Sequence, residues 1–325
     1  MQILVGMHLP AVGPAWFGML MGTSILASAT YAHGLPVIAW PVLVLAWVVA
    51  VVLLGGFGWR LARRPHELAE DLAPAALSSW GMLGMGVMAL GQATGLIIDH
   101  RWAWWVDFAC WVGGTAVGFG FLALIAINFR RMQPPVFAHG LVPVTPMVSA
   151  AAAAGLAEHT VFPAFMGVVA VICFIVAAGV ALPLFAVVYA RTLPGFPPVG
   201  ASCTAFIPLG VCGQSTFAAQ HISAVHDAWH GPALVWGTVM LTLAVVLGTY
   251  AYVTVARGLR HRIGFHPNWW GLTFPVGTCV MGSHQLTQVT GAAGWEIYSV
   301  IALVLLAANW LFAAGATGRA LRNLG

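Results

Sequence analysis

The sequence contains no lysine and is poor in charge of either sign. Its 325 residues include 12 arginines and 8 acidic residues, so charged side chains make up only 6% of the chain. Water-soluble domains carry about 25% charged residues, which excludes an ordinary soluble domain. The arginines lie singly or in short groups without interleaved exposed aromatic residues, so we expect no nucleic acid as a partner.

The sequence also has little from which to build a disulfide or a cofactor site. Its five cysteines lie inside apolar segments and show no Cys-x-x-Cys spacing, which favours buried free thiols. No Walker motif is present, so ATP is not expected to drive the protein directly. The segment MQILVGMHLP has no lysine or arginine and so no basic n-region, and we therefore expect the first apolar run to remain as a membrane segment rather than a cleaved signal. We expect no cofactor and no metal.

Long apolar runs fill the chain, which is 61% hydrophobic. They are continuous over about 20 residues, the length a helix needs to cross a bilayer, and they do not alternate like barrel strands. We therefore predict an all-α integral membrane protein with a single transmembrane domain over residues 1–325. Ten helices are expected, at approximately 14–32, 36–58, 74–98, 102–127, 138–156, 161–190, 199–220, 231–256, 268–290 and 294–316.

The arginines predict how these helices are oriented. With ten helices, eleven arginines fall on one side of the membrane, including Arg130 and Arg131, and only Arg101 falls on the other. Because basic residues are enriched in cytoplasmic loops, we expect both termini in the cytoplasm and the protein in the inner (plasma) membrane.

A pattern rich in glycine, proline and tryptophan recurs in every second helix, at intervals of 63 to 67 residues. We therefore expect five parallel helical hairpins around a central pore, with the odd-numbered helices inside. The alternative is that glycine and proline only help the helices to pack. Helix kinks are expected at the prolines, because proline cannot donate to the carbonyl four residues back. The aligned residues are Trp16, Trp80, Pro143, Pro208 and Pro275, and the hairpins are approximately 14–58, 74–127, 138–190, 199–256 and 268–316.

Three segments resemble the tellurite-resistance/dicarboxylate-transporter family: GPAWFGMLMGTSIL (13–26), FIPLGVCGQS (206–215) and WWGLTFPVGT (269–278). This family includes the bacterial tellurite-resistance protein, plant slow anion channels, and fungal malate permeases and sulfite efflux pumps. The resemblance implies a homotrimer of ten-helix protomers, each with its own pore lined by the odd helices. It also implies a pore-blocking phenylalanine on the ninth helix, which by its position beside proline is Phe274 here.

The predicted pore has no fixed positive charge at mid-depth, because no arginine lies inside a helix. Selectivity would then come from helix dipoles, hydroxyls, amides and backbone groups. The alternative role for the polar side chains is hydrogen bonding between helices. Phe274 and Pro275 are the candidate gate, and the candidate lining residues are Phe17, Thr23, Gln92, Val142, Phe206, Gln214, Gly277, Thr278, Met281, Gln285 and Gln288.

The histidines suggest two further sites. His284 lies inside the ninth helix, where a titratable group is costly unless it is functional, so it is either a proton site or a neutral hydrogen-bonded residue. His226 and His230 are four residues apart, which is a usable metal spacing, but an exposed loop is the preferred interpretation. Asp107 and Glu296 lie near helix ends and are expected to extend to the membrane surface.

We therefore predict a transmembrane channel or facilitator for small anions such as chloride, nitrate, sulfite or malate. The alternative is a proton-coupled carrier of sulfite or of malate, a C4-dicarboxylate. A membrane metalloenzyme is disfavoured, because the sequence has one sparse histidine cluster where such enzymes need several, so we expect no enzyme activity.

Overall fold

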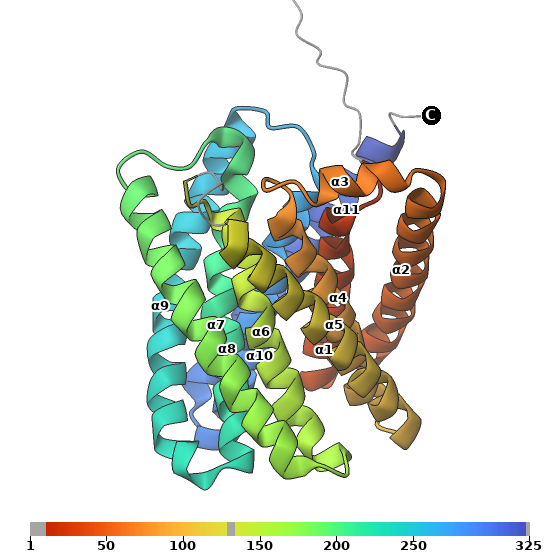
Figure 1. The fold of residues 1–325 in the computed structure, drawn as a ribbon. Helices are drawn as coiled ribbons and strands as arrows, with labels where there is room; N and C mark the ends of the chain where they lie inside the picture. The colour runs from red at the N-terminus through yellow and green to blue at the C-terminus, as the bar shows by residue number, and fades with distance from the viewer. Residues whose placement is uncertain (1–10, 129–133, 323–325) are drawn as a thin grey trace, which may run out of the picture.

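The computed structural model describes residues 11–128 and 134–322, and within these residues every regular element is a helix (Figure 1). Seven helical segments are long and apolar enough to cross a membrane. The prediction of an all-α membrane protein is therefore confirmed. The seven segments are Pro36–Arg63, Leu77–Ile98, Arg101–Asn128, Phe137–His159, Pro163–Thr192, Asp227–Arg260 and Ala293–Arg322.

The helices fall into an inner and an outer set. In the most apolar part of Phe137–His159, 94% of the residues are buried by the rest of the chain, whereas in that of Arg101–Asn128 only 17% are buried. The inner helices are α1 (Phe17–Ala32), α4 (Trp80–Ile98), α6 (Leu141–Leu156), α8 (Ile207–Val225) and α10 (Phe274–Thr290). The outer helices are α2 (Pro36–Arg63), α5 (Arg101–Asn128), α7 (Pro163–Thr192), α9 (His230–Arg260) and α11 (Ala293–Arg322).

The inner helices contact one another in a closed order, α1 to α4, α6, α8, α10 and back to α1. Each outer helix packs against the inner helix that precedes it in the chain, and Figure 1 shows α5, α7 and α9 on the outside of the bundle. The outer helices expose many large apolar side chains, such as Val51, Ile175 and Val246. Such surfaces suit lipid as the surrounding solvent.

Every inner helix begins with a change of helix type. A 3-10 segment comes first, and the α-helix follows it directly or after one residue. The 3-10 segments are η1 (Pro14–Trp16), η3 (Leu77–Ser79), η5 (Phe137–Gly140), η7 (Val199–Phe206) and η9 (Pro267–Leu272). These five junctions lie at the sequence repeats, so the repeat corresponds to a recurring structural feature.

The prolines expected to kink the inner helices lie in the first turn of each α-helix and not in its interior. Pro208 and Pro275 are the second residues of α8 and α10, and Pro143 is the third residue of α6. An N–H in the first helical turn has no acceptor within the α-helix, so proline there loses no hydrogen bond and starts the α-helix instead of bending it. Prolines inside a helix occur instead at Pro146 of α6 and, in outer helices that looked regular in sequence, at Pro41 of α2 and Pro183 of α7.

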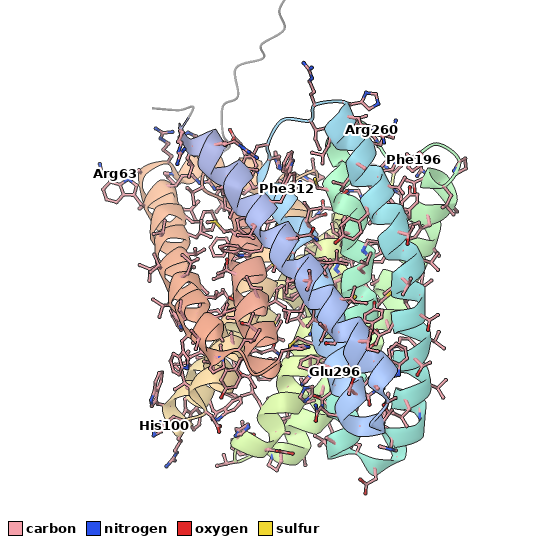
Figure 2. All side chains as sticks on the ribbon, turned by 180° about the vertical axis from the view of Figure 1, so that it is seen from behind. Arg63, His100, Phe196, Arg260, Glu296 and Phe312 are labelled. Carbon is pink, nitrogen blue, oxygen red and sulfur yellow. The ribbon has the colours of Figure 1, made fainter. Side chains whose placement is uncertain are left out.

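The two ends of the bundle differ in charge. Arg63 and Arg260 lie at one end, which we call the arginine end, and His100 and Glu296 lie toward the other (Figure 2). At the arginine end, Arg60 forms ion pairs with Glu67 and with Asp71, the last residue of the short helix α3 (Leu68–Asp71). Arg130 and Arg131, which were counted in predicting the orientation, lie outside the described residues.

Close approach of α8 and α10 depends on Gly213. A Cβ atom at this position would lie 2.3 Å from the backbone nitrogen of Cys279 and 2.4 Å from the carbonyl carbon of Thr278. Backbone atoms cannot move aside as a flexible side-chain tip can, so an alanine at position 213 must separate the two helices.

We predict that Gly213→Ala lowers the stability of the protein by about 1–3 kcal/mol, the usual cost of overpacking. The measurement is the midpoint of thermal unfolding in detergent, followed by tryptophan fluorescence. Gly179→Ala on α7 is the matched control, because nothing lies within 4 Å of a Cβ there. Equal midpoints for the two variants would contradict the close α8–α10 contact.

Candidate functional site

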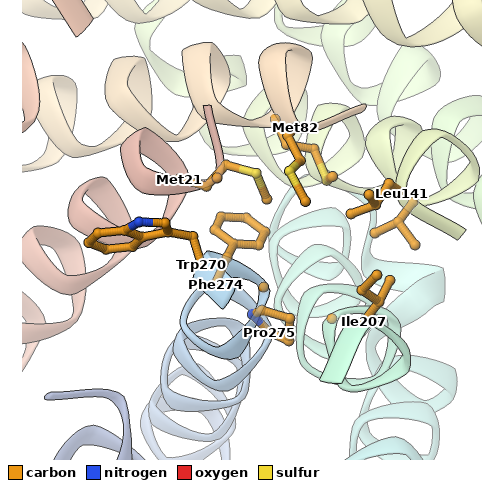
Figure 3. A pocket seen from close by; sticks show the side chains of 12 residues that line it. Met21, Met82, Leu141, Ile207, Trp270, Phe274 and Pro275 are labelled. Carbon is orange, nitrogen blue, oxygen red and sulfur yellow. The ribbon is translucent and has the colours of Figure 1, made fainter. Parts of the chain in front are cut away.

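A small cavity lies where the five inner helices meet, and Figure 3 shows its lining. Its volume is about 20 Å³. A cavity needs a volume of about 10–15 Å³ to hold one water molecule, so this central cavity has room for about one water. Its lining side chains are apolar, and each inner helix contributes: Gly18 and Met21, Met82 and Met85, Leu141 and Val144, Ile207 and Gly210, and Phe274 and Pro275, together with Trp270 and Gly271 from η9.

Phe274 occupies the centre of this arrangement. Its side chain faces those of Met21 and Met82 (Figure 3), and it is only 3% exposed. Phe274 is the first residue of α10, so the junction between η9 and α10 fixes where the ring projects. Leu272 and Trp270, just before the junction, are held by α11.

Two hydrogen bonds from η9 to α11 stabilise this junction. Asn309 Nδ2 donates to the Leu272 carbonyl oxygen at 2.9 Å, and Trp270 Nε1 donates to Thr317 Oγ1 at 3.1 Å. In a membrane, a backbone carbonyl released by irregular structure must find its partner inside the protein. The Asn309 amide supplies that partner, and it thereby positions the start of α10.

A second cavity of about 560 Å³ continues along the same inner faces, away from the arginine end. On α8, Gly210 of the central cavity is followed by Gln214 of this large cavity, and on α10, Phe274 is followed by Met281. Spacings of four and seven residues keep side chains on one helix face. The two cavities therefore follow one another along a common axis inside the ring.

The large cavity has a mixed lining of apolar, polar and titratable residues. Amides of Gln92, Gln214 and Gln285 line it, as do the carboxyl groups of Asp107 and Glu158, and no arginine is among its lining residues in the described part of the chain. Asp107 is 3% exposed, and its Oδ1 has no hydrogen-bond partner among the described residues. The prediction that Asp107 extends to the membrane surface is therefore wrong, because its side chain is enclosed between α5 and α4 beside Gly91.

Several predicted lining residues do lie at the cavities. Phe274 and Pro275 line the central cavity, and the large cavity is lined by Gln92, Gln214, Met281, His284 and Gln285.

Three other candidates face the outer helices instead. Thr23 Oγ1 donates to the Met19 carbonyl oxygen at 2.8 Å and accepts from Trp310 Nε1 of α11 at 3.1 Å. The Phe206 ring packs edge-on against Tyr252 of α9, with centroids 4.8 Å apart. Phe17 packs in the same manner against Phe57 of α2, with centroids 6.4 Å apart.

The remaining four candidates lie between inner helices or at a helix end. A Cβ at Gly277 would meet Ile25 of α1 at 2.5 Å, so this glycine permits helix contact. The Thr278 hydroxyl donates to the Pro275 carbonyl oxygen at 2.8 Å. Val142 is fully buried outside both cavities, and Gln288 is exposed near the end of α10. None of these four residues therefore lines either cavity.

His284 belongs to a cluster that the sequence did not indicate. Its Nδ1 lies 3.4 Å from Glu296 Oε2 of α11, and its ring centroid lies 4.8 Å from that of His33, the residue that ends α1. Glu296 therefore turns toward these histidines. Among the described residues, this is the one group of three that could hold a metal ion, and His226 and His230 are not part of it.

A third hollow of about 380 Å³ lies at the arginine end, lined in part by Trp16, Asp71 and His266. His266 Nδ1 accepts a hydrogen bond from the backbone N–H of Asn268 at 3.1 Å. Burial lowers the pKa of His266 below its ordinary value, which favours the neutral ring that this acceptor role requires.

The SLAC1 family, described as voltage-dependent anion channel, matches residues 11–317. Curated relatives include sulfite efflux pumps of Arthroderma otae, at 22% identity, and of Trichophyton rubrum, at 21% identity. Each alignment covers 92% of this chain and 88% of the relative.

The contrast between the cavities predicts different accessibility of introduced thiols. With half-buried Cys110 replaced by alanine and the other, buried cysteines retained, Gln285→Cys should react with a charged thiosulfonate at least about tenfold faster than Val144→Cys. The reagent is hydrated, and the central cavity has room for about one water. Mass spectrometry of timed samples gives the two rates. Similar rates would show that solvent reaches both positions equally.

Proposed function

The chain belongs to the SLAC1 family of voltage-dependent anion channels, and from this premise we propose that it is a channel or facilitator for small anions with its own pore in each chain. The family match confirms the resemblance stated from three sequence segments. It also places the protein among membrane channels and transporters. The function proposed here is therefore transport across a membrane rather than enzyme activity.

The proposed pore runs through the ring of inner helices. In this proposal all ten helices cross the membrane as five parallel hairpins, with the termini in the cytoplasm. The closed order of contacts among the inner helices supports it, as do the cavities that follow one another along their inner faces. The three inner helices α1, α8 and α10 are then spans shielded from lipid by the outer helices. The family resemblance adds a homotrimer of such chains.

Phe274 is the proposed gate, and its position in the central cavity is the observation that carries this function. The large cavity could hold a hydrated anion, but the central cavity has room for about one water beside the Phe274 ring. A narrow apolar constriction stops ions because they cannot keep their hydration shell there. Conduction then requires the ring to move away from Met21 and Met82.

Anion preference in this proposal comes from backbone dipoles. Leu141, Ile207 and Phe274 line the central cavity, and they are the first residues of α6, α8 and α10. The N-terminal end of an α-helix carries a partial positive charge. Several helix starts at one level favour an anion where no lysine or arginine side chain lies.

Sulfite is a candidate substrate, because curated relatives are named sulfite efflux pumps. Chloride, nitrate and malate remain candidates on size and charge.

The sulfite efflux pumps among the relatives and the buried Asp107 together favour a second candidate function, a proton-coupled carrier of sulfite or malate. An isolated buried carboxyl group is stable in a membrane mainly in its neutral form, so Asp107 is suited to take up and release a proton. The titratable groups near it are Cys110 on its own helix and Glu158, His159, His221 and His284 around the cavity.

We predict that Phe274→Ala raises anion flux through reconstituted vesicles by at least about tenfold, which corresponds to a barrier about 1.4 kcal/mol lower. The measurement is chloride and sulfite efflux under a defined anion gradient. Phe206→Ala is the matched control, because this phenylalanine is also buried at the start of an inner helix but packs on Tyr252 away from the cavity. Unchanged flux for Phe274→Ala, or an equal increase for Phe206→Ala, would contradict the gate.

Proton coupling predicts a separate effect at Asp107. If the protein is a carrier, a pH gradient should drive sulfite uptake in the wild type, and Asp107→Asn should remove this drive while leaving flux down a sulfite gradient. Glu158→Gln serves as the control, because this carboxyl group lines the same cavity but is exposed. If the wild-type sulfite flux does not change with the pH gradient, the carrier function is excluded and the channel function remains.

A further inference from the structure

His33, His284 and Glu296 bring three metal-ligating groups together from three helices. Their ligand atoms all lie within 4.8 Å of one another. His33 Nε2 is 3.9 Å from Glu296 Oε1, and His284 Nδ1 is 3.4 Å from Glu296 Oε2. Two imidazoles and one carboxylate form a ligand set typical of zinc sites that keep an open fourth position.

We propose that these three residues bind one divalent transition-metal ion, of the chemistry of zinc, at the wall of the large cavity. Zinc–nitrogen and zinc–oxygen bonds of about 2.0–2.2 Å place tetrahedral ligands about 3.3–3.5 Å apart. The His284 Nδ1–Glu296 Oε2 distance of 3.4 Å already has this value. His33 Nε2 lies 3.9 Å from the other carboxylate oxygen, Oε1, and the three ligand atoms lie within 4.8 Å of one another, so His33 must move closer to the other two ligands when the ion binds.

Two of the ligand atoms face each other and have no further partner. His284 Nδ1 and Glu296 Oε2 are buried and lie within ion-pair distance of one another at 3.4 Å, and neither has another hydrogen-bond partner among the described residues. Buried polar atoms without a partner are rare because each one costs stability. A metal ion between them would satisfy both at once.

His33 is oriented as a metal ligand should be. Its Nδ1 lies 2.8 Å from the Ala29 carbonyl oxygen, which can only accept, so Nδ1 carries the proton and Nε2 is the atom left to coordinate. A backbone carbonyl that fixes the tautomer in this way is a recurrent feature around metal-bound histidines. Nε2 also lies 2.9 Å from Ser299 Oγ, whose proton is directed to the Val280 carbonyl oxygen. Nε2 thus faces oxygen atoms of Ser299 and Glu296, an arrangement that a cation stabilises.

The metal would reach this site from the large cavity, because His284 lines that cavity and the Glu296 side chain is 39% exposed. With two neutral histidines and one carboxylate, a divalent ion leaves one net positive charge. This charge would lie beside a cavity that no arginine lines among the residues that the structure describes. Its effect on anions rests on the proposed function, but binding of the metal does not.

The test uses the full chain, purified in detergent with an affinity tag other than polyhistidine and stripped of metal with a chelator. Zinc titration followed by calorimetry should give one bound ion per chain, and saturation should raise the midpoint of thermal unfolding. Cobalt(II) in place of zinc should give the intense visible absorption of four-coordinate cobalt. Removing a hydrogen-bond partner of a metal ligand already lowers metal affinity by about 10–100-fold. Removing a ligand itself, by His284→Gln or Glu296→Gln, should therefore weaken zinc binding by at least about tenfold.

His221→Gln is the matched control, because His221 lines the same cavity but lies outside the cluster. It should keep wild-type zinc affinity. The proposal is overturned if the wild type binds no stoichiometric zinc, a result that does not depend on how any variant folds. It is also overturned if folded His284→Gln binds zinc like the wild type. Neither readout involves anion flux, so the metal site and the proposed function can fail independently.

Discussion

Satisfaction of backbone hydrogen bonds away from water is the constraint on which the rest of this structure depends. Five inner helices change from 3-10 to α form at the sequence repeats, and each change disturbs the regular hydrogen-bond ladder in a region that lipid surrounds. At the start of α10 the disturbance is compensated by α11, through Asn309 and the Leu272 carbonyl oxygen. This support holds Phe274 at the first position of the α-helix. The gate proposed above is therefore a consequence of where a helix begins, and Pro275 marks that beginning.

The sequence predicted the elements well, because their causes are local. Apolar runs, loop arginines and the recurring Gly/Pro pattern indicated the ten long helices of the described residues but not the short helix α3. The sequence predicted less well which face of each inner helix turns toward the cavities. By residue type, Gln92 and Thr23 are both expected to line a pore. Gln92 does line the large cavity, whereas Thr23 accepts a hydrogen bond from Trp310. Which face of an inner helix turns inward is decided by packing against neighbours from elsewhere in the chain, and one sequence does not record that packing.

The cluster at His284 shows the same limit more sharply. His284 and Glu296 are near one another in sequence, but His33 comes from the first hairpin and meets them only because α10 packs against α1. That contact closes the ring of inner helices. No local spacing rule detects such a site, whereas His226 and His230, which do have a usable spacing, are not brought together with a third ligand. Spacing along the sequence is thus weaker evidence for a metal site here than the meeting of residues from three parts of the chain.

The acidic lining of the large cavity places an electrostatic condition on anion transport. An ionised carboxylate about 6 Å from a monovalent anion raises its energy by about 3 kcal/mol at an effective dielectric constant of about 20, which lowers occupancy roughly a hundredfold. Asp107 and Glu158 both line this cavity, and no arginine among the described residues lines it to offset them. In the proposed transport, an anion occupies the cavity more readily when these carboxyl groups are neutral or a cation lies nearby. Burial of Asp107 favours its neutral form, and the metal ion proposed at His33, His284 and Glu296 would supply a cation. If the chain functions as proposed, anion entry, protonation and metal binding are coupled through one cavity, and each should alter the free energy of the others.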